Sequence, residues 1–309
     1  MLRGRPVLGN GQKRGRSTRS RLYALFSARP PRPQIGKIGW MGNPQHVARM
    51  RFVYGSDDDE LHAMLSESLA PRSQDFLLDL AMPLLTHESR LLDIGCRDAR
   101  HLIPLVTRSR CTGVGIDPVD RNVDRARAAV AAAALDQRIE IRHGVMEQIE
   151  ESDSSIDVIW CRDVLESIPD LPSGLSEVAR VLRPGGAAVI YTVFATSRLE
   201  PREAAALTQP LGTVQQNLER QWVEEAFEQA GFRVERLEEI GTEFREYDEE
   251  RTRPVSDGLL RLARLRRRRE EVIRRFGKEK YDLSEASLQW LAYLLLGKLE
   301  PVAYVLRLP

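Results

Sequence analysis

The sequence is short of cysteine, of net charge and of long apolar runs, and each shortage excludes a class of protein. Its 309 residues include three cysteines, too few for a disulfide framework, and we therefore expect a reducing, cytoplasmic location. Lysine and arginine number 46 against 45 acidic residues, so no global field favours a nucleic acid or a membrane surface as partner. No apolar run reaches the roughly 20 residues that a membrane span needs. The 42% of hydrophobic residues is enough for one sizeable core and an appendage.

The first 55 residues contain no acidic side chain at all. They carry twelve arginines and lysines, with Pro30, Pro31 and Pro33 clustered and little apolar material to bury. A disordered basic extension over 1–55 is the simplest interpretation of this composition. An organelle transit peptide and a nucleic-acid-binding arm fit the composition as well. This segment therefore predicts no function.

Residues 90–117 carry the most informative pattern of the chain, in which two apolar runs flank a helix-length stretch. The first run ends at Asp93 and Gly95, and the second ends at Asp117. Glycine at such a turn lets a ligand approach the backbone, because no side chain stands in the way. The acid that closes the second run lies 22 residues after Gly95, where it can accept hydrogen bonds from a ribose diol. The unit therefore predicts a site for a nucleoside-containing cofactor.

The turn after the first apolar run suits a dinucleotide poorly. Arg97 and Arg100 stand where the later glycines of G-x-G-x-x-G let a pyrophosphate approach the backbone. Asp93–Cys96 instead resembles the first motif of class I S-adenosylmethionine-dependent methyltransferases, of the small-molecule, type 11-like kind. Ser155–Ile168 resembles the segment around that family's fourth strand, and Glu177–Gly186 resembles its E-x-x-R-V-L-K-P-G-G signature.

The resemblance implies a Rossmann-like α/β fold. Its doubly wound, seven-stranded sheet would be mostly parallel, with an antiparallel last strand inserted between the fifth and the sixth. The core would cover 56–240, a helical insertion that we interpret as a lid would cover 241–300, and the last strand would cover 301–309. The alternation of apolar runs and helical stretches agrees with a parallel sheet that is covered by helices on both faces. We expect strands at 90–95, 111–117, 138–143, 156–161, 186–194 and 232–240, and helices at 57–69, 73–85, 98–108, 120–135, 173–182, 219–230, 256–276 and 282–297.

The resemblance also implies the cofactor, S-adenosylmethionine, and its binding residues. These lie at the ends of the first four strands: Asp93, Gly95, Cys96, Arg97, Asp117, Pro118, Met146, Glu147, Cys161 and Arg162. Asp93 would receive the amino group of the methionine moiety, with a turn-capping acid as the alternative. Asp117 would receive the ribose, with a helix N-cap as the alternative. Glu147 would take over from the family's adenine-facing acid, because Val145 stands in that position.

Methyl transfer from a sulfonium mainly needs nucleophile, methyl carbon and sulfur to be held in line. A base matters only if the acceptor arrives protonated, so the lack of a recognisable dyad does not exclude the reaction. We therefore predict a methyltransferase that acts on a small-molecule acceptor and uses no metal. Its candidate catalytic residues are Asp163, Glu246 and Tyr247, and the last two favour a cationic acceptor such as an amine.

Four departures from the family pattern keep alternatives open. Arg97 and Ala99 replace two glycines of the first motif, Val145 replaces the adenine-facing acid, and Ser167 replaces a histidine. A degenerate cofactor-binding protein with a structural or regulatory role is one alternative. An RNA methyltransferase is the other, and it rests only on the basic N-terminus and the arginine run 266–269.

Overall fold

The computed structural model describes residues 43–55 and 58–309, and the chain divides into two units between Ser66 and Glu67. The described part of the first unit forms helices α1 (Pro44–Gly55) and α2 (Asp59–Leu65), neither of which buries a residue. Proline in the first turn and glycine at the end favour a helix over the bounds of α1. Helix α1 thus lies within the segment that we predicted to be disordered. The rest of that prediction, residues 1–42, lies outside the described residues.

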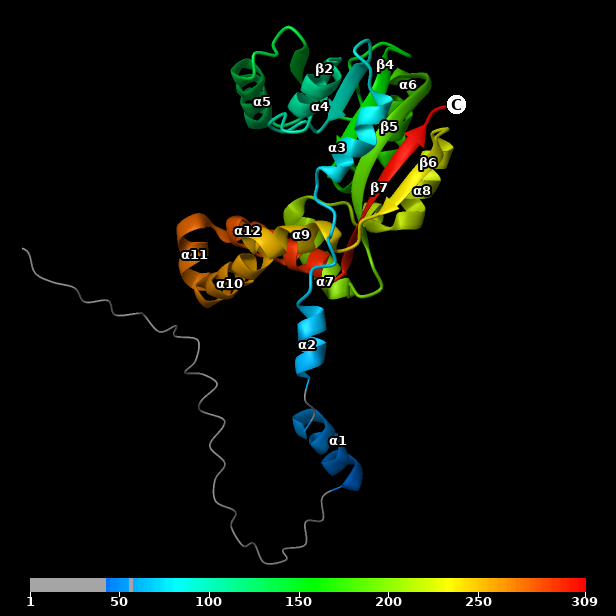
Figure 1. Ribbon diagram of the computed structural model, residues 1–309. Coiled ribbons are helices and arrows are strands. Elements are labelled where there is room, and N and C mark those ends of the chain that lie inside the picture. Colours follow the sequence, from blue (N-terminus) through cyan, green and yellow to red (C-terminus); the bar gives the residue numbers. More distant parts are fainter. Residues whose placement is uncertain (1–42, 56–57) are drawn as a thin grey trace, which may run out of the picture. The chain divides into compact units, whose positions relative to one another are not determined.

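The second unit is built on a seven-stranded sheet in the order β3-β2-β1-β4-β5-β7-β6 (Figure 1). Its strands are β1 (Arg90–Ile94), β2 (Thr112–Asp117), β3 (Ile139–His143), β4 (Ile156–Arg162), β5 (Leu182–Ala195), β6 (Arg233–Glu239) and β7 (Leu299–Arg307). Strand β7 pairs antiparallel with both β5 and β6, and the other pairs are parallel. The predicted fold class, with an antiparallel last strand between the fifth and sixth strands, is confirmed.

Helices cover both faces of the sheet, because successive strand residues point to opposite sides. They are α3 (Phe76–Ala81), α4 (Leu102–Ser109), α5 (Asp120–Ala132), α6 (Leu171–Val181), α7 (Pro201–Leu211) and α8 (Arg220–Gln229). Leu91 of β1 packs into one core with side chains of α3, α4 and α5. The next residue, Leu92, packs into a second core with side chains of α6 and α8.

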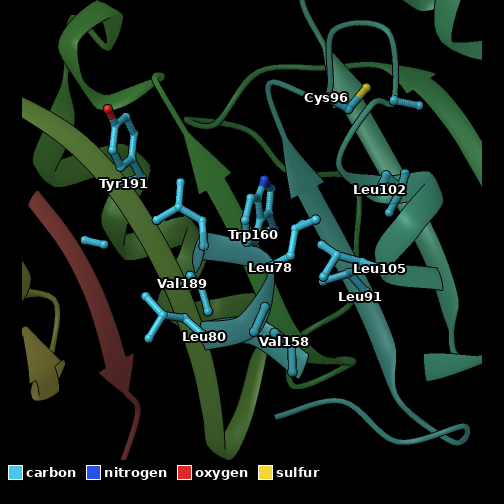
Figure 2. Close-up of a cluster of buried hydrophobic side chains, with 14 of the residues drawn as sticks. Leu78, Leu80, Leu91, Cys96, Leu102, Leu105, Val158, Trp160, Val189 and Tyr191 are labelled. Carbon is cyan, nitrogen blue, oxygen red and sulfur yellow. The ribbon is translucent and has the colours of Figure 1, made fainter. Parts of the chain in front are cut away.

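The first core ends in polar atoms at one edge of the sheet. Figure 2 shows the indole nitrogen of Trp160, the hydroxyl of Tyr191 and the sulfur of Cys96 at the same end of the cluster. Cys96 lies two residues after the last residue of β1, so this end is the carboxyl edge of the parallel strands. In the described residues, Trp160 Nε1 is buried without a hydrogen-bond partner. Ligands of open α/β sheets bind at this edge.

The insertion between β6 and β7 differs from the predicted helices. It contains α9 (Glu243–Thr252), α10 (Pro254–Arg267), α11 (Arg269–Phe276) and α12 (Lys278–Leu295). The single helix predicted over 256–276 is wrong, because the backbone leaves the helical conformation at Arg268. The helix predicted over 282–297 begins four residues earlier, at Lys278 directly after Gly277. Gly297 has a left-handed φ of 63° just beyond α12, as a C-terminal glycine should.

Other element boundaries also differ from the predicted ones. Helix α4 starts at Leu102 and not at 98, because Ala99 in the preceding turn has a left-handed φ of 59°. Helix α3 ends at Ala81, and a 3-10 turn containing Pro83 follows it. Strand β5 starts at Leu182, four residues before the predicted start at 186. In the described part of the chain, no helix is both long enough and apolar enough to cross a membrane.

Candidate active site

A cavity of about 830 Å³ lies at the carboxyl edge of the sheet, over the ends of β1 to β4. Its volume is in the range of small-molecule sites. Nine of the predicted site residues line it: Gly95, Cys96, Arg97, Asp117, Pro118, Met146, Glu147, Arg162 and Asp163. Asp93, Cys161, Glu246 and Tyr247 do not line it. The cavity therefore brings together most of the predicted cofactor residues and one of the three catalytic candidates.

The turn after β1 keeps a glycine-like backbone although two of its expected glycines are absent. Gly95 has a φ of 72°, and a Cβ atom there would lie 2.5 Å from Val164 Cγ2. Arg97 and Ala99 also have left-handed φ values, of 58° and 59°. That conformation costs a non-glycine residue about 1–2 kcal/mol. The departures from the family pattern therefore place two non-glycine residues in a strained conformation within this turn.

Asp117 ties this turn to the end of β2. Its Oδ2 accepts a hydrogen bond from the Arg97 amide at 3.0 Å. Its Oδ1 accepts from the Val119 amide at 2.9 Å and from Asn122 Nδ2 at 3.0 Å. A carboxylate offers about four acceptor positions, so one is left on Oδ2. The N-cap alternative is wrong, since the N-cap residue of α5 is Val119.

Asp93 does not line the cavity and lies in β1 between Gly115 and Trp160 of the neighbouring strands. It is 2% exposed, and its Oδ2 accepts no hydrogen bond within residues 43–55 and 58–309. Burial, and then the charge of Asp117, raise the pKa of Asp93 well above its ordinary value. A buried carboxyl oxygen without a partner is costly, so this group favours carrying its own proton.

Arg162 organises the end of the cavity at β4. Its Nη1 lies 2.8 Å from His101 Nε2, its Nη2 donates to Gln74 Oε1, and its Nε lies 3.3 Å from Asp163 Oδ2. The guanidinium also lies 5.2 Å from the centre of the Tyr191 ring. Burial, together with nearby arginine charges, lowers the pKa of His101 to about 4. The imidazole is therefore neutral near pH 7, and its Nε2 accepts the hydrogen bond from Arg162.

Glu166 is a buried acid next to this network that the sequence analysis missed. Its Oε1 accepts hydrogen bonds from Thr192 Oγ1 at 3.0 Å and from the Val193 amide at 2.7 Å. Its Oε2 has no partner in the described residues. Burial, and then the charge of Asp163, raise the pKa of Glu166 to about 7. Glu166 can therefore hold or release a proton close to neutral pH.

Gln74, His101 and Leu211 also line the cavity and were not predicted as site residues. Gln74 precedes α3 and lies 88 residues before Arg162, so no local pattern connects the two. Leu211 ends α7, a helix that was missed although it begins with a capping box and Pro201. The capping box and Pro201 are the sequence features that could have predicted the start of α7.

The two residues on which the predicted amine site rests, Glu246 and Tyr247, lie outside the cavity. Glu246 accepts a hydrogen bond from Thr242 Oγ1, and the Tyr247 ring is covered by the Arg251 guanidinium 3.5 Å from its centre. Both residues are engaged on α9 and do not line the cavity. Cys161 is 1% exposed and packs in the second core, where burial raises the pKa of its thiol. No described residue of 241–300 lines the cavity, so the lid stays a prediction.

The methyltransferase domain family matches residues 65–237, more than half of the chain. The chain therefore belongs to this family, and its resemblance to class I S-adenosylmethionine-dependent methyltransferases is confirmed.

Among curated relatives, 27-O-demethylrifamycin SV methyltransferase of Amycolatopsis mediterranei is 32% identical over 133 residues, which are 43% of this chain and 47% of the relative. Dimethylglycine N-methyltransferase of Parasynechococcus marenigrum is 30% identical over 155 residues, 48% of this chain and 54% of the relative. The chain thus spans about half the length of these relatives.

Solved structures with the same fold include the [4+2]-cyclase SpnF, with a TM-score of 0.61 and 18% identity over 79% of this chain and 85% of that one. Geranyl diphosphate methyltransferase in complex with SAM has a TM-score of 0.58 and 15% identity over 76% of this chain and 84% of that one. At such identities these structures establish the fold alone.

Proposed function

We propose that this protein binds S-adenosylmethionine in the cavity and transfers a methyl group to a small-molecule acceptor. The observation that carries the proposal is the Asp117 carboxylate, which faces the cavity at the end of β2 with one acceptor position left. That position suits a ribose hydroxyl. The relatives named above are, by their names, methyltransferases of a rifamycin derivative and of dimethylglycine, which supports a small-molecule acceptor.

The cavity fits this cofactor in volume and in its polar groups. Asp117 and Pro118 would hold the ribose, Met146 and Glu147 the adenine, and the backbone of the turn from Gly95 to Arg97 the methionine end. When bound, the cofactor supplies a methyl group that is activated by the positive charge of its sulfonium.

The chain's own contribution is to position the acceptor and to receive its proton. The network of Arg162, His101 and Gln74 makes the β4 end of the cavity rigid, and in-line geometry needs such rigidity. Asp163 lines the cavity and can take a proton from an acceptor that arrives protonated. Glu166, with its pKa of about 7, is the neighbouring acid whose charge state changes near neutral pH.

Calorimetry with S-adenosylhomocysteine tests the proposed binding. We expect Asp117→Ala to weaken binding by about 1.5–3 kcal/mol, the range for hydrogen bonds to a charged group. Asp124→Ala, on the exposed side of α5, is the control and should bind as the parent does. Equal affinity in the Asp117 variant and the parent would refute the assignment of Asp117.

Incubation with labelled cofactor tests the proposed reaction. A metabolite extract and total RNA are supplied as separate acceptors, and we expect label in the small molecules only. Binding of S-adenosylhomocysteine without transfer to either pool favours the degenerate cofactor-binding protein, and label in RNA favours the RNA methyltransferase.

A further inference from the structure

Two oppositely charged side chains that line the cavity have no partner in the described residues. Glu147 lines it near the end of β3, and Arg97 lines it at the turn after β1. Within the described part of the chain, neither side chain makes a hydrogen bond or an ion pair. A binding site that contains an unpaired carboxylate and an unpaired guanidinium favours ligands that bring a positive group to the first and a negative group to the second.

The other basic side chains that line the cavity are paired or neutral. Arg100 pairs with Asp98, with 2.7 Å between Nη2 and Oδ2. Arg162 pairs with Asp163, and His101 is neutral near pH 7. One positive charge is therefore left over, and Arg97 carries it. A guanidinium has five N–H donors, of which Arg162 uses three in these contacts. Two donors therefore remain on Arg162.

The Arg97 side chain acts on the β4 end of the cavity and not on the Asp117 side alone. After burial and the charge of Arg162, the Arg97 charge is a smaller influence that lowers the pKa of both His101 and Asp163. Its left-handed backbone is held by the hydrogen bond from its amide to Asp117 Oδ2. A bulky residue that keeps such a conformation is strained, and strain of this kind gathers at ligand sites.

We propose that Arg97, together with the spare donors of Arg162, binds an anionic group of the methyl acceptor, a carboxylate or a phosphate. A planar guanidinium matches both groups with paired N–H donors. The inference rests on the proposed function and names its substrate class. It replaces the cationic acceptor that Glu246 and Tyr247 suggested in the sequence.

The test uses the full chain saturated with S-adenosylhomocysteine and three matched probes: benzoate, phenyl phosphate and neutral benzyl alcohol. Saturation-transfer NMR should show the parent binding the two anions more tightly than the alcohol. Arg97→Gln and Arg97→Gly should each weaken anion binding about tenfold, the lower end for a charge-assisted hydrogen bond. The glycine variant also accepts the left-handed backbone, so misfolding does not explain a loss. Arg121→Gln removes the same charge from the exposed start of α5 and should change nothing.

Anion binding that is absent in the parent, or equal in the parent and both Arg97 variants, overturns the inference. Separate titrations with S-adenosylhomocysteine and with 5′-methylthioadenosine, which lacks the carboxylate, decide the remaining cases. Arg97 variants that lose affinity only for S-adenosylhomocysteine assign Arg97 to the cofactor's carboxylate, which also overturns the inference. A parent that binds neither nucleoside overturns the proposed function, and the inference with it.

Discussion

The two halves of the cavity are built in different ways. The half at β2 and β3 is made by Asp117, Pro118 and Met146, which end strands or follow them within a few residues. The half at β1 and β4 adds Gln74, His101 and Leu211, which come from before α3, the start of α4 and the end of α7. The first half is thus determined by local chain geometry, whereas the second depends on how three helices pack on the sheet.

The largest expected effect comes from Gly95, because both halves depend on its turn. Gly95→Ala forces a Cβ against Val164 and places a side chain at a φ of 72°. We expect a loss of about 2–4 kcal/mol in the free energy of unfolding, measured in urea. Gly212→Ala is the matched control, since its φ is 68° and nothing lies within 4 Å of the new Cβ. A loss in Gly95→Ala no larger than in Gly212→Ala would show that the contact with Val164 relaxes freely.

Glu166 allows the surroundings of the β4 half to be tested through the pH dependence of the unfolding free energy. Because its pKa is raised to about 7 from 4.5, the folded protein holds this proton more tightly than the unfolded chain does. Its contribution to stability is full at low pH and is lost as the pH rises from about 4.5 to about 7. We expect Glu166→Gln to remove roughly 3 kcal/mol of this pH dependence in urea titrations. Exposed Glu150→Gln is the control, and identical pH profiles of the Glu166 variant and the parent would contradict the assignment.

Arg97→Gly measures the strain at the junction of the two halves. We expect the variant to gain up to about 1 kcal/mol in unfolding free energy, since glycine adopts a φ of 58° without steric cost. Arg110→Gly, at a φ of 64° beyond α4, is the comparison outside the cavity. A loss of stability in Arg97→Gly but not in Arg110→Gly would mean that the Arg97 side chain supports the fold.

Deletion of residues 1–50 should have the smallest effect of all. The described helices of this unit, α1 and α2, bury no side chain. We expect the melting temperature and the affinity for S-adenosylhomocysteine to stay those of the full chain. A large drop in either would assign a structural role to this unit.

The sheet could be predicted from sequence because each strand carries its own signal. The run Val158–Cys161 is apolar throughout, as expected of a strand buried on both faces. The turn at Gly95 and the acid at Asp117 follow from the same local patterns.

The rest of the site could not be predicted, because its contacts join distant segments. Nothing near Gln74 indicates Arg162, and nothing near Glu166 indicates the Val193 amide 27 residues later. Helix α9 was missed because it is polar on most sides and buries only Phe244, so it lacks an apolar stripe. The aromatic and acidic residues on α9 resembled a binding site in sequence, but their partners are on the helix itself or beside it.

The connection between β6 and β7 begins and ends at one place in the sheet. Glu239 pairs with Val302, and the Ile240 amide donates to the Pro301 carbonyl at 3.1 Å. Strands β6 and β7 are therefore neighbouring antiparallel strands, and the four helices between them form one long hairpin connection. Each doubling of a loop's length costs only about 0.6 kcal/mol in closure entropy. The pairing of β6 with β7 therefore constrains the length of this connection only weakly, and its fixed position comes from side chains such as Phe244, Ala286 and Leu294 that pack into the first core.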